Sequence, residues 1–230
     1  MDSETLSQIF SEIGEEYDFL HVDAAFKPFD EIKVKWMRMG QTASFSVTDY
    51  LQDAPEEVIR DIANRIMMRI RTDDCSPYSD TTNKYLTSID FVQRNQPIYL
   101  SRKSGISEST KGEHRDIQDS YERLLSKGLV DEIECLQLRW SSTVTESEHG
   151  QSSMLMRTVL VPTFLDTDEI SDEAFDFNLY RLLMNVCIDF SIDPFERKKI
   201  VEEKVGSYPG RNELENIIAD RFLRKIGGEC

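Results

Sequence analysis

The sequence predicts an α+β protein. Apolar and polar residues alternate over 32–48, which indicates a pair of half-buried strands. Apolar residues spaced three and four apart over 58–70 indicate an amphipathic helix. A composition of 39% hydrophobic and 30% charged residues is typical of a globular chain rather than a disordered one.

Length and charge narrow the class of protein. The 230 residues are enough for one large domain or two small ones. The net charge of −16 disfavours attraction to nucleic acid or anionic lipid, so we expect neither as a partner. No apolar run approaches the length of a membrane span, and the acidic N-terminus lacks the features of a signal peptide. We therefore expect a cytoplasmic protein, while its oligomeric state is not predicted.

The first half is predicted to contain a helix, a hairpin and a second helix. An amphipathic pattern indicates a helix at 1–17, and the strands on either side of Gly40 form the hairpin. Asp53 is expected to be the N-cap of the second helix and Pro55 its first residue.

The segment 72–111 is predicted to be largely irregular. It is rich in Ser, Thr, Asp and Asn and contains Pro97, which disfavours a long helix. We expect at most short helices at 82–86 and 91–94, followed by an extended stretch that exposes Tyr99.

The second half is predicted to be a helix, two strands joined by a polar loop, and three more helices. These elements are expected at 112–127, 133–140, 154–161, 176–185, 195–205 and 211–226. The helix around 176–185 has an inward apolar stripe that includes Cys187 and extends to Phe190. Its outward stripe is polar and consists of Asn178, Arg181, Asn185 and Asp189.

We expect two domains, an N-terminal α+β unit of 1–105 and a C-terminal domain of 106–230. In each half a strand is followed by an acidic turn and a helix, beginning at Asp49 in the first half and at Phe164 in the second. The N-terminal unit is therefore either a decayed repeat of the C-terminal domain or a separate accessory unit.

A longer pattern follows the last predicted strand. It consists of the strand end Val159-Leu160-Val161, the pair Leu165-Asp166, an acidic turn, and the helical segment Leu179-Tyr180-Arg181-Leu182-Leu183-Met184-Asn185. In this frame the C-terminal half resembles the SprT-like and minigluzincin group of zinc metallopeptidases, whose helix reads L-Y-H-E-L-L-H. The resemblance implies a zincin-like domain, with a sheet packed on the active-site helix.

The residues that perform chemistry in that family are replaced in this chain. The resemblance puts Arg181 and Asn185 at the two histidine positions, Leu182 at the general base, and Lys199 or Arg197 at the third ligand. An arginine stays protonated and cannot bind a cation, and leucine cannot accept a proton. We therefore expect neither zinc nor another cofactor, and no peptidase catalysis at this helix.

Two interpretations of the polar stripe remain open. In the first, Arg181 occupies the place of the metal as a fixed cation, paired with an acid such as Asp189 or Asp176. Asn178, Asp189 and Arg197 would then lie in a cleft beside it. In the second, these residues form a solvated helix face.

Three classes of function follow. The preferred one is a catalytically inactive peptidase-like protein that acts by binding a protein or a peptide. The second is an enzyme, either a metal-dependent hydrolase with ligands that the pattern does not reveal or one with non-metal chemistry. The third is an acidic structural or adaptor subunit.

The remaining candidates are histidines, cysteines and a basic cluster. His21 is expected to be a hydrogen-bonded edge residue, His114 to cap or pair, and His149 to bind a metal weakly at most. The widely spaced cysteines are expected to be free thiols: Cys75, Cys135, Cys187 and Cys230. Four basic residues around the hairpin form either a solvated sheet face or a small anion-binding patch: Lys27, Lys33, Lys35 and Arg38.

Overall fold

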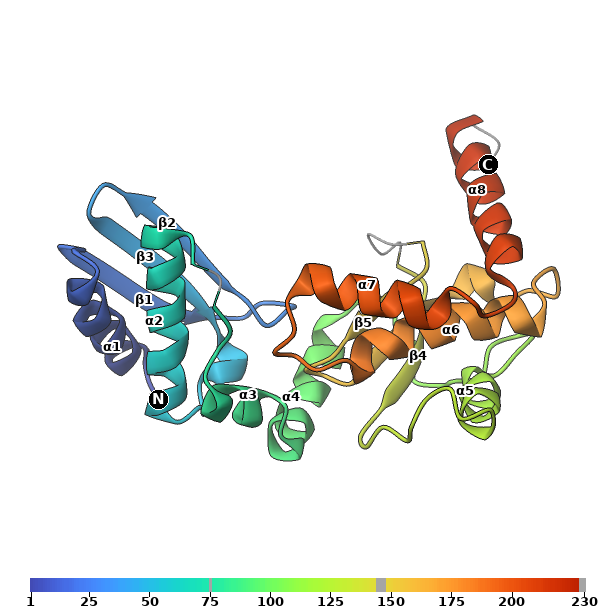
Figure 1. Ribbon diagram of the computed structural model, residues 1–230, viewed down its shortest axis with the longest axis horizontal. Coiled ribbons are helices and arrows are strands. Elements are labelled where there is room, and N and C mark those ends of the chain that lie inside the picture. The colour runs from blue at the N-terminus through green and yellow to red at the C-terminus, as the bar shows by residue number, and fades with distance from the viewer. Residues whose placement is uncertain (75, 144–147, 228–230) are drawn as a thin grey trace. The chain divides into compact units, whose positions relative to one another are not determined.

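The computed structural model describes residues 1–74, 76–143 and 148–227 (Figure 1). Within these ranges the chain forms eight α-helices and two small three-stranded mixed sheets, so the α+β prediction is confirmed. The chain separates into two compact units, unit 1 (Met1–Asn95) and unit 2 (from Gln96 onward). No helix in the described ranges is both long and apolar enough to cross a bilayer.

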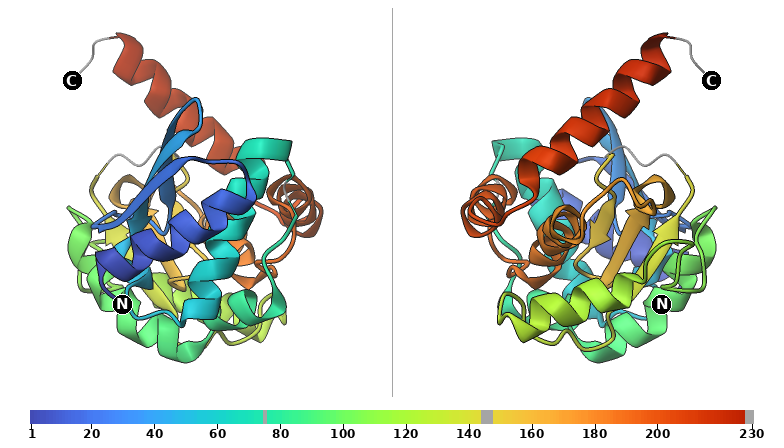
Figure 2. Two further views of the ribbon diagram at one scale, coloured as in Figure 1. Left: turned by 90° about the vertical axis from the view of Figure 1, so that its left-hand side faces the viewer. Right: turned by 90° about the vertical axis from the view of Figure 1, so that its right-hand side faces the viewer.

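Unit 1 is a mixed sheet covered on one face by two helices (Figure 2, left). Its strands lie in the order β1-β3-β2, with β3 parallel to β1 and antiparallel to β2. Its elements are α1 (Ser3–Glu16), β1 (His21–Lys27), β2 (Val34–Met39), β3 (Thr42–Thr48), the 3₁₀ turn η1 (Asp49–Leu51), α2 (Glu56–Thr72), α3 (Asp80–Leu86) and α4 (Ile89–Arg102), which ends in unit 2.

Unit 2 places a sheet of the same kind against a helix that other helices surround (Figure 2, right). The strand order is β4-β6-β5, with β6 parallel to β4 and antiparallel to β5. Its elements are α5 (Ile117–Ser126), β4 (Gln137–Ser141), β5 (Gln151–Ser153), β6 (Thr158–Pro162), η2 (Thr163–Leu165), α6 (Asp172–Cys187), α7 (Pro194–Val205) and α8 (Arg211–Gly227).

The two units share one topology. Each has a helix, three strands, a 3₁₀ turn and a second helix in that order, and in each the third strand lies between the other two. The two strand–turn–helix segments that look alike in sequence are equivalent in this topology, β3–η1–α2 and β6–η2–α6.

The core of unit 1 lies between the helices and one face of the sheet. Val22, Phe45 and Val47 point to this face and are almost fully buried. Phe10 of α1 packs on Phe45 with ring centroids 5.0 Å apart. The β2–β3 hairpin is closed by a two-residue turn whose first residue, Gly40, has φ +63°, a conformation that favours glycine. The predicted hairpin is therefore confirmed.

The core of unit 2 is organised around α6. The helix contacts α5, α7, α8, β5 and β6, so eleven of its sixteen residues are buried. Ser171 caps its N-terminus, because its hydroxyl accepts the N–H of Ala174 at 3.2 Å. Trp140 of β4 packs against Phe175 on the sheet side, with ring centroids 5.7 Å apart.

The prediction of an irregular 72–111 segment is wrong in its centre. α4 runs continuously through Pro97, and Tyr99, predicted to be exposed, is 1% exposed. The buried side of the helix includes Asn95 and Gln96, whose polar character hid the helical period. Gln96 donates to the carbonyl oxygens of Cys135 and Met156 at 2.8 and 2.7 Å, which satisfies a buried amide.

Several predicted boundaries also change. α2 starts at Glu56 with Pro55 as its N-cap residue, so Asp53 is not the cap. The helix predicted at 112–127 begins only at Ile117, because the preceding N–H groups bind the carboxylate of Asp166 instead. β1 was not predicted as a strand.

The predicted strand 154–161 is divided between two elements. Its first residues form the turn between β5 and β6, where Arg157 donates its N–H to the carbonyl oxygen of Met154 at 3.1 Å. Arg157 has φ +43°, which ends the extended run. The strand predicted at 133–140 likewise starts only at Gln137.

Candidate functional site

The polar side of α6 faces other parts of unit 2. Asn178, predicted on a solvated stripe, is fully buried, and its amide Nδ2 donates to the carbonyl oxygen of His149 at 2.9 Å. His149 precedes β5, so the contact joins the middle of α6 to the loop at the sheet edge. The interpretation of the whole stripe as a solvated face is therefore wrong at Asn178.

Arg181 lies one turn further along α6 and is partly buried. Its Nε is 3.9 Å from Oε1 of Glu202 on α7, and Oε2 of the same carboxylate is 3.2 Å from Nη2 of Arg211 at the start of α8. One carboxylate is thus shared by two guanidinium groups, each of which retains donors. The predicted partners Asp189 and Asp176 are both wrong.

His149 completes this group. Its Nε2 is 3.7 Å from Oε1 of Glu215 on α8, and its side chain is 17% exposed. Burial lowers the pKa of His149 below its usual value, and the positive charge of Arg181 lowers it further, while Glu215 acts in the opposite direction. This environment favours the neutral form of the imidazole.

We call this set the Arg181 cluster. It brings together side chains from the loop before β5 and from three helices, namely His149, Asn178, Arg181, Glu202, Arg211 and Glu215. The glutamates and Arg211 are 36–45% exposed, so the outer part of the cluster is open to a partner while Asn178 anchors it within the core.

Leu182 and Asn185, the other two residues of α6 predicted to replace site residues, have structural roles. Leu182 is buried, and its Cδ1 lies 3.2 Å from where a Cβ on Gly150 would stand. Asn185 is half-buried and donates from Nδ2 to the carbonyl oxygen of Arg181 at 3.0 Å, within the same helix. A base at 182 or a ligand at 185 would therefore need a different environment.

The remaining candidates are not brought to Arg181. Arg197 donates from Nη2 to the carbonyl oxygens of Phe190 and Ile192 at 3.0 and 2.9 Å, so it fastens the connection between α6 and α7. Asp189 accepts the N–H and the hydroxyl of Ser191, both at 2.8 Å. Lys199 is exposed on α7.

Asp176 belongs to a second polar group on the α5 side of α6. Although the residue is 1% exposed, its carboxylate accepts from Ser120 Oγ at 2.6 Å and from Arg123 Nη2 at 2.6 Å, with Lys127 Nζ at 3.7 Å. The hydrogen bond to Asp176 raises the pKa of Arg123. This carboxylate is fully engaged and ties α5 to α6.

Asp166, the acid of the Leu-Asp pair, binds a turn of backbone. Its carboxylate accepts the N–H groups of Glu113, His114 and Arg115. A Cβ on Gly112 would overlap this carboxylate, which explains the glycine. His114 Nδ1 lies 3.1 Å from Asp168, in agreement with its predicted pairing role.

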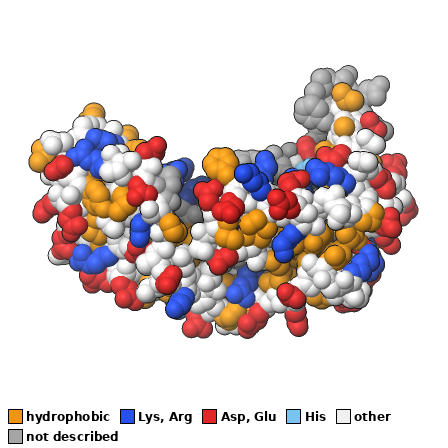
Figure 3. Space-filling model, viewed as in Figure 1, with side chains coloured by type: hydrophobic (Ala, Val, Ile, Leu, Met, Phe, Trp, Pro, Cys, Tyr) orange, Lys and Arg blue, Asp and Glu red, His pale blue; other side chains and the backbone are white. Residues whose placement is uncertain are grey.

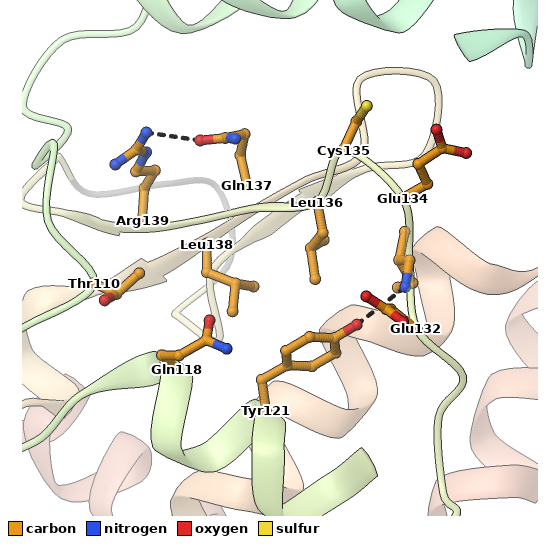
Figure 4. Close-up of a pocket in the computed structure, with 11 residues that line it drawn as sticks. Thr110, Gln118, Tyr121, Glu132, Glu134, Cys135, Leu136, Gln137, Leu138 and Arg139 are labelled. Atoms are coloured by element: carbon orange, nitrogen blue, oxygen red, sulfur yellow. Dashed lines mark hydrogen bonds between the residues drawn. The ribbon is translucent and has the colours of Figure 1, made fainter.

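Two concave surfaces lie elsewhere in unit 2. A pocket of about 490 Å³ runs between α5 and β4 and is lined by Gln118, Tyr121 and Leu138 among others (Figure 4). A smaller one of about 320 Å³ lies at the C-terminal end of α6, where Asp189 and Cys187 line it. Cys187, predicted in the core, is exposed because the helix ends there.

Sequence reasoning missed Glu202, Arg211 and Glu215. They lie on α7 and α8, outside the motif that drew attention to α6, and no spacing links them to Arg181.

Cys135 is a free thiol like Cys187, and Cys75 and Cys230 lie outside the described residues. Across the described ranges, no three His, Cys, Asp or Glu side chains are grouped as a metal site would require. No protein-family model matches the chain, and neither a curated protein nor a solved structure matches it significantly.

Proposed function

We propose that unit 2 is a zincin-like domain without catalytic zinc, and that the protein acts by binding a protein or peptide segment at the Arg181 cluster. The observation that carries the proposal is that the three α6 residues at the positions expected to serve zinc chemistry each have another contact. Arg181 is paired with Glu202, Leu182 packs in the core and Asn185 bonds to its own helix. Each position that would serve zinc chemistry has another role.

The charge arrangement supports binding at this place. Two guanidinium groups share the carboxylate of Glu202, and Arg211 is 44% exposed, so an incoming carboxylate or carbonyl oxygen finds free donors. The buried amide of Asn178 holds α6 to the loop before β5, which keeps the donors in position.

A peptide library displayed on phage tests the proposal. We expect wild-type protein to enrich a peptide family without cutting it, and Arg181→Gln to lose the enrichment because the shared carboxylate then keeps only Arg211. Lys199→Gln is the matched control, since it removes a positive charge from an exposed site on α7.

Two results would contradict the proposal. One is cleavage of the selected peptides, or stoichiometric zinc in protein purified without added metal. The other is equal enrichment by wild type and Arg181→Gln, which would move the binding site away from this cluster.

A further inference from the structure

β2 is an open edge of the unit 1 sheet. In an antiparallel pair, successive residues turn their backbone N–H and C=O alternately toward and away from the partner strand. Thr48 of β3 donates to the carbonyl oxygen of Lys33 at 3.1 Å, so Lys33 and every second residue after it face β3. The backbone groups of Val34, Trp36 and Arg38 therefore point away from the sheet.

The other long sheet edges are covered. On β1, the outward N–H groups of Ala24 and Phe26 donate to the hydroxyls of Ser7 and Ser3 of α1, at 3.2 and 3.4 Å. On β4, an isolated bridge joins Ser141 to the segment before α5, and Ser107 donates to the carbonyl oxygen of Trp140 at 2.9 Å. Among the described residues, neither a loop nor a side chain bonds to the outward backbone groups of β2. An uncovered edge is a template for pairing with another strand.

The side chains of β2 also expose apolar surface. Trp36, Met37 and Met39 are 51%, 72% and 81% exposed. Trp36 lies on one face of the strand and the two methionines lie on the other, so both faces of the edge expose apolar surface. Methionine side chains adapt to varied partners, and exposed aromatic side chains are frequent anchors at interfaces.

Positive charge is held beside this edge in a chain whose net charge is −16. The ammonium groups of Lys33 and Lys35 each lie 5.3 Å from the centroid of the Phe29 ring. Arg38 lies 5.6 Å from the Phe19 ring and donates from Nε to the carbonyl oxygen of Gly40. At the upper left of Figure 3, basic and apolar side chains gather over unit 1.

We propose that β2 is a docking edge for an extended acidic segment of another protein, which adds to the sheet as a fourth strand. The backbone groups of Val34, Trp36 and Arg38 pair with that segment, its apolar residues cover Trp36 and the methionines, and its acids face the basic side chains. A second copy of this chain fits worse, because pairing β2 with itself brings the basic side chains of two such edges together, whereas an acidic segment neutralises them.

The first test uses a fluorescein-labelled peptide of alternating valine and glutamate, with an alternating valine and lysine peptide as its counterpart. We expect the acidic peptide alone to bind. Trp36→Pro should abolish binding, because it removes an outward backbone N–H and the exposed indole ring. Proline is tolerated at such an edge position, so the variant should still fold. Lys35→Glu should weaken binding several-fold, while Lys27→Glu, the same charge change on exposed β1, should leave it unchanged.

Hydrogen exchange supplies a readout that needs no variant. The amides of Val34, Trp36 and Arg38 should exchange fast in the free protein and slowly with the acidic peptide bound. Binding without this protection, or binding that survives Trp36→Pro, would overturn strand addition. A dimer that protects the same amides without peptide would overturn the choice of occupant. The Arg181 cluster plays no part in this inference, so neither proposal depends on the other.

Discussion

The helix that follows the sheet is half-exposed in unit 1 and surrounded in unit 2. α2 buries one stripe, which includes Val58, Ile62 and Met67, whereas α6 is buried on nearly every side. The element order before the two helices is the same, and the difference comes from what packs afterwards, because α7 and α8 close over α6. The same topology therefore produces an ordinary surface helix in one unit and a core helix in the other.

The polar residues of the two helices differ accordingly. On α2, Glu56 and Arg60 form an exposed pair at 2.7 Å, which contributes little to stability. On α6, Asp176, Asn178 and Arg181 all have specific partners on other elements. Arg60 of α2 also reaches another element, Glu12 of α1 at 2.7 Å, so the difference lies in burial: Asp176 and Asn178 are almost fully buried, whereas the polar pair on α2 is exposed.

The largest expected effect is at Asp176. Asp176→Asn removes the counter-charge of Lys127 and leaves Arg123 only the more distant and exposed Asp172, at 3.9 Å, so we expect a loss of about 2–3 kcal/mol in unfolding free energy. Glu56→Gln on α2 should cost at most about 0.5 kcal/mol. Hydrogen exchange in urea reports the stability of α6 and α2 separately. Equal losses of stability in the two variants would contradict the difference between the two helices.

Two glycines give the next contrast. Gly150 has φ +109°, and a Cβ there would stand 2.4 Å from the carbonyl oxygen of Leu160. Gly150→Ala should therefore destabilise unit 2 by about 2 kcal/mol or more. Gly40, at φ +63°, has no atom within 4 Å of such a Cβ, so Gly40→Ala should cost only the backbone strain of about 1 kcal/mol. Thermal unfolding of both variants measures the difference, and a larger loss for Gly40→Ala would contradict it.

The smallest effect is a pH dependence at His149. Its pKa is lowered in the folded state by burial and by Arg181, so the unfolded chain binds the proton more readily. Stability from this residue is therefore present above the usual pKa of about 6.5 and decreases as the pH falls below it. We expect His149→Gln to lose less stability than wild type between about pH 7.5 and pH 5.5, by no more than about 1 kcal/mol. An identical slope for His149→Gln and wild type would show that His149 titrates normally.

Local patterns account for much of the fold. Helical periods at α1, α7 and α8 and the alternation of the β2–β3 hairpin were enough to predict these elements, since each depends on neighbours in sequence. α4 was missed because its stripe includes Asn95 and Gln96 and because Pro97 lies inside it. For the candidate site, the sequence indicated α6 and Arg181, but it did not indicate the residues that pair with Arg181.

The sequence by itself determined the α+β class, the negative charge and the presence of Arg181, Leu182 and Asn185 at the helix positions on which the proposed resemblance depends. Only the tertiary structure decided which polar groups are buried and with whom they pair. The position of Asn178 in the helical period would be the same whether its face were solvated or covered. Its burial follows from the loop at His149 that covers it. Partners such as Glu202 come from elements far along the chain, and a helical period describes one face of a helix but not what packs against that face.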